Sequence, residues 1–211
     1  MCSGGGGPVA VLARINSLKD CKFTLTDLHP NLPAFHRISL ESGGRVGFCE
    51  KSVDATKCDY RDGNAKFLRT MFASMHHMQP ALLKDILKDC VEKGNPFGAF
   101  EITNRSIFSL LHLPFAVPAI VIIYVLKNFL RKGLMKGLLY ALFTIPIPII
   151  PLTLLLDGWT SCLRTYSRKE FMAIAQEADP ERKYDWVVVE RMAEGVSLPL
   201  TVYMGLPAIK N

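Results

Sequence analysis

Short apolar segments alternate with longer amphipathic ones over the first half of the chain. Continuous apolar runs rich in β-branched and aromatic residues are typical of buried strands, and four are predicted at 23–26, 45–53, 67–75 and 97–103. Between them, segments 31–38 and 79–91 place apolar side chains at helical spacing and predict amphipathic helices. Strands that alternate with helices in this way predict a parallel α/β sheet.

The alternation stops at residue 107, where two long apolar segments begin. Residues 107–126 and 137–156 contain no Asp, Glu, Lys or Arg, and a basic hinge at 127–136 separates them. Each segment has about 20 residues, the number needed to cross a hydrocarbon layer of ~30 Å. Prolines within them favour kinked or re-entrant segments over straight spans, and these are Pro114, Pro118, Pro146, Pro148 and Pro151.

The alternation resumes at residue 157. Ser167 followed by Glu170 forms a capping-box pattern, which predicts a helix from there through Ala178. Residues 184–189 and 200–205 then predict two strands. Because a short loop joins them, we expect these last two strands to be antiparallel.

A glycine-rich bend at Gly4–Gly7 opens the chain, and Pro8 then suits the first position of a helix through Ile15. Asp27 follows the first predicted strand. A glycine bend that leads into a helix, with an acid after the next strand, is the pattern that binds a nucleoside. Three alternatives stay open: a disordered tail, an Asp27 helix cap, and a dinucleotide site.

Composition and charge narrow the class of protein. The chain has 211 residues, of which 49% are hydrophobic and 21% charged, so it has enough apolar residues for a sizeable core. This length fits one domain with an appendage, and we divide it into 1–106, 107–156 and 157–211. The net charge of +6 comes without interleaved aromatic and basic residues, which favours an anionic membrane surface over nucleic acid.

The six cysteines show no metal-binding spacing with each other or with histidine. Several lie in apolar surroundings, so we expect reduced, buried thiols, no metal site and a cytosolic location. The glycine-rich N-terminus also lacks the charged and apolar regions of a signal peptide.

The ordered set of motifs resembles class I S-adenosylmethionine (SAM)-dependent methyltransferases, and within them a subgroup with an apolar insertion. The resemblance runs from Cys2 to about Pro207. Besides the glycine bend, the matching segments are 26–31, 52–55, 72–77, 100–101, 157–166 and 205–207. The resemblance implies a Rossmann-like three-layer α/β sandwich with a mostly parallel sheet, an antiparallel last strand and an inserted apolar helical hairpin.

The resemblance also implies roles for particular residues. The glycine bend would hold the methionine part of SAM and Asp27 the ribose hydroxyls, while residues after the third strand would face the adenine. The implied cofactor-binding residues are Gly4, Gly5, Gly6, Asp27, Leu28, Val53, Asp54, Ala55 and Ser74. His76 and His77 are the candidate catalytic residues, placed where the family commonly positions groups that face the methyl acceptor.

Simpler interpretations of these side chains stay open. Asp54 fits an ordinary loop carboxylate, and adjacent residues such as His76 and His77 on an extended segment point opposite ways, so we expect at most one to face the site. Glu101 in an apolar strand needs a partner, and Arg105 or Arg164 would supply a structural ion pair.

One departure from the family pattern concerns the first strand. The family places a central strand before the glycine bend, whereas only Met1 precedes Cys2 here. Without this strand its two neighbours would stand ~9–10 Å apart. We therefore expect a truncated form of the methyltransferase, or else a decayed or partner-completed scaffold.

The apolar segment 107–156 sets the expected location. Two helices that cap the sheet would need a polar outer face, which neither run supplies. Full crossing would put the basic hinge opposite a cytosolic catalytic domain, against the positive-inside tendency. We expect a hairpin that dips into the cytosolic leaflet and a methyltransferase acting on an apolar or lipid-like small-molecule acceptor. The alternative is a non-catalytic membrane-associated protein. The sequence does not predict the oligomeric state.

Overall fold

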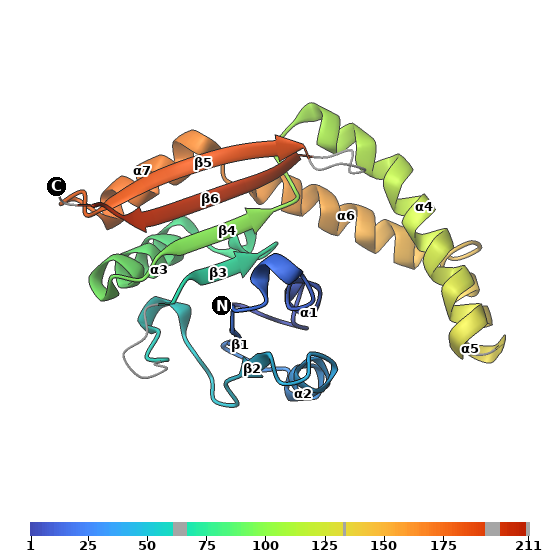
Figure 1. Cartoon of the computed structure of the whole chain (residues 1–211). Coiled ribbons are helices and arrows are strands. Elements are labelled where there is room, and N and C mark those ends of the chain that lie inside the picture. Colours follow the sequence, from blue (N-terminus) through green and yellow to red (C-terminus); the bar gives the residue numbers. More distant parts are fainter. Residues whose placement is uncertain (61–66, 133, 193–198, 210–211) are drawn as a thin grey trace.

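The fold contains two β-sheets with helices around them and one long helical projection (Figure 1). The computed structural model describes residues 1–60, 67–132, 134–192 and 199–209. In the smaller sheet, β1 (Phe23–Leu25) is parallel to β2 (Val46–Phe48). The larger sheet has the order β3-β4-β6-β5. Its strands are β3 (Arg69–Phe72), β4 (Phe97–Glu101), β5 (Tyr184–Met192) and β6 (Pro199–Pro207).

Strand directions follow the sequence prediction. β3 and β4 are parallel, as β1 and β2 are, whereas β6 is antiparallel to both of its neighbours, β4 and β5. A mixed α/β architecture with an antiparallel last strand is therefore confirmed. Two predicted strands are too long: the chain leaves the sheet after Phe48 and after Phe72.

The N-terminal residues lie between the two sheets. The Met1 amino group donates a hydrogen bond to the Thr70 carbonyl of β3 at 2.8 Å. Ser3 N donates to the carbonyl of Thr26, directly after β1, at 3.1 Å, and the Ser3 hydroxyl accepts from Thr26 N at 3.2 Å. Among the described residues no strand pairs with both β1 and β3. The strands therefore form two separate sheets, divided at the position where a central strand was expected.

Two apolar cores support the sheets. Helices α3 (Pro80–Lys93) and α7 (Arg168–Ala178) share a core with the larger sheet, in which Leu83, Phe97 and Phe171 are fully buried. Helices α1 (Val9–Leu12) and α2 (Leu32–Glu41) cover the smaller sheet. The capping box of Ser167 and Glu170 is present at the start of α7, as predicted.

The apolar insertion is a helical hairpin that projects away from the sheets (Figure 1). It consists of α4 (Ile107–Lys132), α5 (Leu134–Leu142) and α6 (Ile149–Arg164). The predicted basic hinge at 127–136 contains the junction of two helices, and its described residues are helical, since 127–132 belong to α4 and 134–136 to α5. Pro114 and Pro118 lie inside α4, which continues through both, and α6 extends beyond the apolar segment to Arg164.

Small residues allow the hairpin helices to pack closely. A Cβ added to Gly137 would lie 2.4 Å from the Phe129 ring, and one added to Gly158 would lie 3.1 Å from Leu113. The inner face carries the buried Val117, Val121 and Val125. Among the described residues, Ile107–Lys127 is the one helical segment long and apolar enough to span a membrane, with a mean hydropathy of 2.2 and 22% of it buried.

Candidate functional site

The glycine bend and Asp27 are in direct contact. The backbone of Gly4, Gly6 and Gly7 adopts positive φ angles, which let the chain fold back toward β1. Gly4 N then donates a hydrogen bond to Asp27 Oδ2 at 2.8 Å. A Cβ added at Gly4 or Gly5 would meet no atom within 4 Å, so the outer side of the bend is open to a ligand.

The loops after β1 and β2 are joined beside this bend. Asp27 Oδ1 accepts from His29 N at 2.9 Å, and the Asp27 carbonyl accepts from Val53 N at 2.9 Å. The Ser52 hydroxyl donates to the carbonyl of Leu28, whose side chain is 49% exposed. These hydrogen bonds bring Asp27, Leu28 and Val53 to one edge of the smaller sheet.

Asp54 is fixed by its own loop. Its Oδ1 accepts from both the backbone N and the hydroxyl of Thr56 at 2.8 Å, and these bonds lower the pKa of the carboxyl. Asp54 thereby caps the short 3-10 helix Ala55–Lys57, so the loop-carboxylate role left open by the sequence is present. Burial raises the pKa of the Cys2 thiol, and the carboxylates of Asp27 and Asp54 add smaller contributions in the same direction.

The chain turns sharply after β3. Ala73 has a φ of 46°, and Met75–His77 form a 3-10 helix in place of the predicted extended segment. The rings of His76 and His77 therefore do not point opposite ways but lie 4.1 Å apart, centroid to centroid. His76 is buried and His77 exposed. The Ser74 hydroxyl is buried and has no hydrogen-bond partner among the described residues.

Glu101 at the end of β4 holds this turn. The side chain is fully buried, and its two oxygens accept from Met75 N and from His76 Nδ1, both at 2.7 Å. The expected partners of Glu101 are wrong, because Arg105 pairs with Glu170 at 2.9 Å and His76 takes the place of an arginine. The buried carboxylate thus orients an imidazole.

The end of α6 borders the same turn. Burial and then the neighbouring His76 lower the pKa of His77, while the Asp157 carboxylate acts in the opposite direction. The positive charge of Arg164 also lowers the pKa of His77. The Tyr166 hydroxyl donates to the Met78 carbonyl at 2.7 Å. The helix that leaves the hairpin therefore ends beside the histidines.

Side chains from both sheets meet around the N-terminal segment. Met1, Cys2 and Ala55 pack against the core cluster that contains Met75, and a Cβ added at Gly7 would lie 4.0 Å from Phe72 Cβ. The bend, the loops after β1 and β2, and the turn after β3 are thus neighbours. This arrangement has the elements of a nucleoside site: open backbone amides, a carboxylate and an unpartnered buried hydroxyl.

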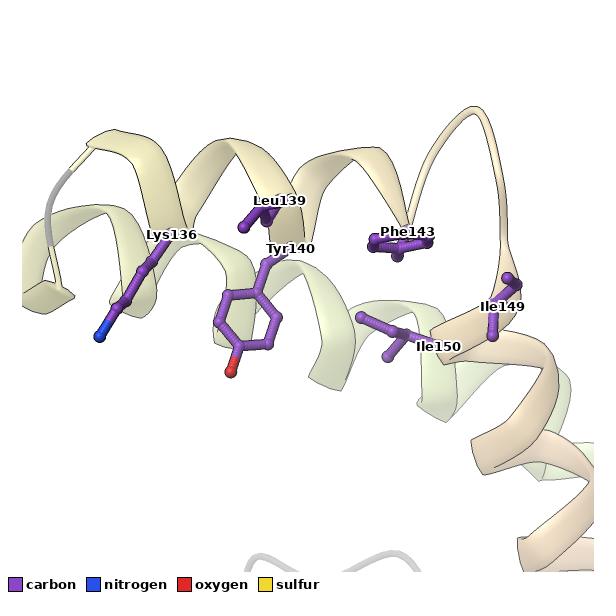
Figure 2. Close-up of a pocket in the computed structure, with 6 residues that line it drawn as sticks. All are labelled: Lys136, Leu139, Tyr140, Phe143, Ile149 and Ile150. Atoms are coloured by element: carbon purple, nitrogen blue, oxygen red, sulfur yellow. The ribbon is translucent and has the colours of Figure 1, made fainter.

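Other polar clusters and hollows lie elsewhere. Among the described residues no group of three or more His, Cys, Asp or Glu side chains is placed to hold a metal. A hollow of about 300 Å³ lies over charged side chains of α3, including Asp85 and Glu92. A second, of about 510 Å³, lies in the hairpin between α5 and the start of α6 (Figure 2).

Solved methyltransferase structures share this fold. The methyltransferase domain of bacterial CtHen1 aligns with a TM-score of 0.51 and 14% identity over 97% of this chain and 86% of that one. An O-methyltransferase candidate from Nostoc punctiforme gives 0.52 and 13% over 96% of this chain. An O-methyltransferase family protein from Burkholderia thailandensis gives 0.51 and 13% over 98%. This chain spans about half, 49%, of each of these last two.

By sequence alone, no protein-family profile and no curated protein matches the chain. The structural alignments nevertheless cover nearly all of it, so its fold is that of the class I SAM-dependent methyltransferases. The predicted fold class is confirmed.

Proposed function

We propose that the protein transfers a methyl group from SAM to a small, apolar or lipid-like acceptor at a membrane. The observation that carries the proposal is the contact between the glycine bend and Asp27, at 2.8 Å, within a methyltransferase fold. A carboxylate has about four lone-pair positions. Hydrogen bonds to Gly4 and His29 therefore leave acceptor capacity for two ribose hydroxyls.

The proposed cofactor-binding residues lie on neighbouring loops, joined by the hydrogen bonds described above. The open backbone of Gly4 and Gly5 would receive the methionine part, with the buried Gly6 holding the shape of the bend. The loops carrying Leu28, Val53, Asp54 and Ala55 would receive the adenine. The Ser74 hydroxyl, buried and without a hydrogen-bond partner among the described residues, lies in the turn after β3. When bound, SAM supplies an electrophilic sulfonium methyl group, so the protein has to position the acceptor and manage one proton.

His76 is suited to take that proton. Glu101 accepts the Nδ1–H of His76 at 2.7 Å, which leaves Nε2 as the basic nitrogen. An acceptor hydroxyl would lose its proton to Nε2 while its oxygen takes the methyl group. His77, exposed beside Asp157, would contact the acceptor.

The hairpin supports action at a membrane. Only 22% of Ile107–Lys127 is buried, whereas a core helix of a soluble protein is mostly buried. Large apolar side chains such as Phe115, Leu130 and Ile145 are more than 70% exposed. Exposed apolar patches of this extent mark membrane or protein contacts. The methyltransferase domain would then face the cytosol, where SAM is available.

Calorimetric titration with SAM tests the cofactor. We expect saturable binding by the full chain and about tenfold or greater weakening in Asp27→Ala, because hydrogen bonds from the ribose to a charged group are lost. Asp20→Ala changes an exposed carboxylate outside the site and is the matched control. Absence of SAM binding in the folded chain would remove the cofactor claim.

Methyl transfer is tested with radiolabelled SAM and a membrane lipid extract. His76→Ala should lower label incorporation by about a hundredfold or more, the usual contribution of a general base, with unchanged SAM affinity. Equal incorporation by both proteins would exclude His76 as the base.

A non-catalytic membrane-associated protein on the same scaffold is the second candidate. The parting of the sheet between β1 and β3 favours it, because the missing pairing weakens the support of the glycine bend. Alkaline carbonate washing of membranes, combined with the SAM titration, separates the two. Membrane retention without SAM binding supports the second candidate, and full recovery in the soluble fraction opposes any insertion.

A further inference from the structure

The hairpin carries charge of one sign only. Residues 107–156 contain four lysines and arginines and no acidic residue, so this segment supplies +4 of the net charge of +6. Its basic residues gather where α4 ends and α5 begins, the part of the hairpin farthest from the sheets (Figure 1). A long apolar segment with a cationic end is complementary to an anionic lipid, which has apolar acyl chains and a negatively charged headgroup.

One face of α5 combines both properties. Lys136, Leu139, Tyr140 and Phe143 recur at helical spacing and line the 510 Å³ hollow, which Ile149 and Ile150 of α6 close at its far end. Figure 2 shows Lys136 Nζ and the Tyr140 hydroxyl on the same side of α5, with the apolar side chains of Phe143 and Ile150 beyond them. The hollow is therefore cationic at one end and apolar at the other.

The length of α5 matches half a bilayer. Its nine residues rise about 13 Å, close to the ~15 Å hydrocarbon depth of one leaflet. Lys136 lies in the first turn of α5, near the cationic end, while Phe143 follows its last residue. A lipid with its phosphate at Lys136 would have its chain running alongside the helix toward the middle of the layer.

We propose that this hollow binds one anionic phospholipid, with its phosphate at Lys136 and an acyl chain against Leu139, Phe143 and Ile150. The site rests on the membrane contact proposed above but not on methyl transfer. It differs from general attraction to a charged surface, because it requires a particular lysine and a particular leucine.

Two matched pairs of variants isolate the site. Lys136 lines the hollow and Lys127 does not, although both are exposed cations near the same end of the hairpin. Leu139 lines the hollow and Leu138 does not, although both are 51% exposed on α5. Lys136→Gln and Leu139→Gln are therefore the test variants, with Lys127→Gln and Leu138→Gln as their controls.

Native mass spectrometry of the full chain in a neutral detergent measures lipid adducts. With dioleoyl-phosphatidylglycerol we expect a one-lipid adduct retained about fivefold more strongly than with dioleoyl-phosphatidylcholine, the factor typical of one lysine at a lipid surface. Lys136→Gln should abolish this preference, and Leu139→Gln should weaken binding of both lipids. The two control variants should behave as the unmodified chain, and inorganic phosphate should not compete.

Equal retention of both lipids, no adduct, or equal losses in a test variant and its control would overturn the proposal. A SAM titration of the same preparation keeps this result separate from the proposed activity. SAM binding with no lipid preference removes only the lipid site, whereas a lipid preference without SAM binding removes only the methyltransferase.

Discussion

Gly6 is the residue of the bend that tolerates a side chain least. It is buried with a φ of 98°, and an added Cβ would lie 2.1 Å from Ile38 Cδ1. Gly6→Ala should therefore lower the free energy of unfolding by about 1–2 kcal/mol or more, the cost of a left-handed backbone plus the displaced isoleucine. Gly5→Ala, which meets open space, is the control in thermal unfolding, and equal effects would contradict this account.

Cysteine reactivity separates buried from exposed thiols. Cys90 is fully buried, and desolvation raises the pKa of its thiol to about 12, so the reactive thiolate is scarce at neutral pH. Cys21 is exposed. Iodoacetamide should modify Cys21 in the native protein and Cys90 only after denaturation, as read by peptide mass spectrometry. Rapid native labelling of Cys90 would show that the α3 core opens readily.

The hydrogen-bond partner of each polar side chain was the least predictable feature of the site. The contact between Gly4 and Asp27 was predictable, because the sequence contains the order of glycine bend, helix, strand and acidic residue that brings the two together. Glu101 was expected to meet an arginine, because charge alone does not specify which cation folds beside it. The pairing with His76 depends on the turn after β3, which no local pattern signals.

Among the elements, α7 begins with the clearest sequence signal. The Ser167 hydroxyl accepts from Glu170 N, and Glu170 in turn accepts from Ser167 N at 2.8 Å. Ser167→Ala should cost about 1 kcal/mol of unfolding free energy, because the backbone N–H of Glu170 loses the hydroxyl that accepts its hydrogen bond. Lys169→Ala in the same turn is the control, and chemical denaturation of both variants gives the measurement.

The same box makes the stability of α7 depend on pH. The hydrogen bond from Ser167 N, and then Arg105, lower the pKa of Glu170 below its ordinary value. The folded state therefore binds fewer protons than the unfolded one, so this contribution is full at neutral pH and is lost as pH falls through the lowered pKa. Glu170→Gln should destabilise the protein at pH 7 and much less near pH 3. A constant difference across that range would exclude this role.

The amphipathic helices were predictable from the sequence to within a few residues, whereas strand ends and the helix bounds in the apolar insertion were not. The segment 79–91 gave α3 (Pro80–Lys93), because its apolar spacing and the break at Gly94 are local. The predicted strand 45–53 shrinks to β2 (Val46–Phe48), since Val53 N bonds the Asp27 carbonyl and draws the chain away from the sheet. The described residues of the predicted hinge at 127–136 are helical, because lysines and arginines are as compatible with a helix as with a loop.

At the scale of the whole molecule, the parted sheet predicts two levels of stability. β1 and β2 have three residues each, whereas β5 and β6 pair over nine positions. Among the described residues, Met1 donates a backbone hydrogen bond to Thr70 in β3, and Ser3 donates one to Thr26 directly after β1. Hydrogen–deuterium exchange should therefore be markedly faster in 23–25 and 46–48 than in 184–192. Equal protection would show that the two sheets unfold as one unit.

Helix α6 belongs to both the hairpin and the edge of the site. From Leu156, the last residue of the apolar segment, to Arg164 the helix rises about 12 Å. This part of the helix sets a fixed distance between the hydrocarbon layer of the membrane and the turn that carries His76 and His77. Under the membrane contact proposed above, an acceptor whose acyl tail stays in the membrane would present only its polar end to the histidines. Hydroxyl groups of a lipid headgroup would therefore be within reach, and positions along the acyl tail would not.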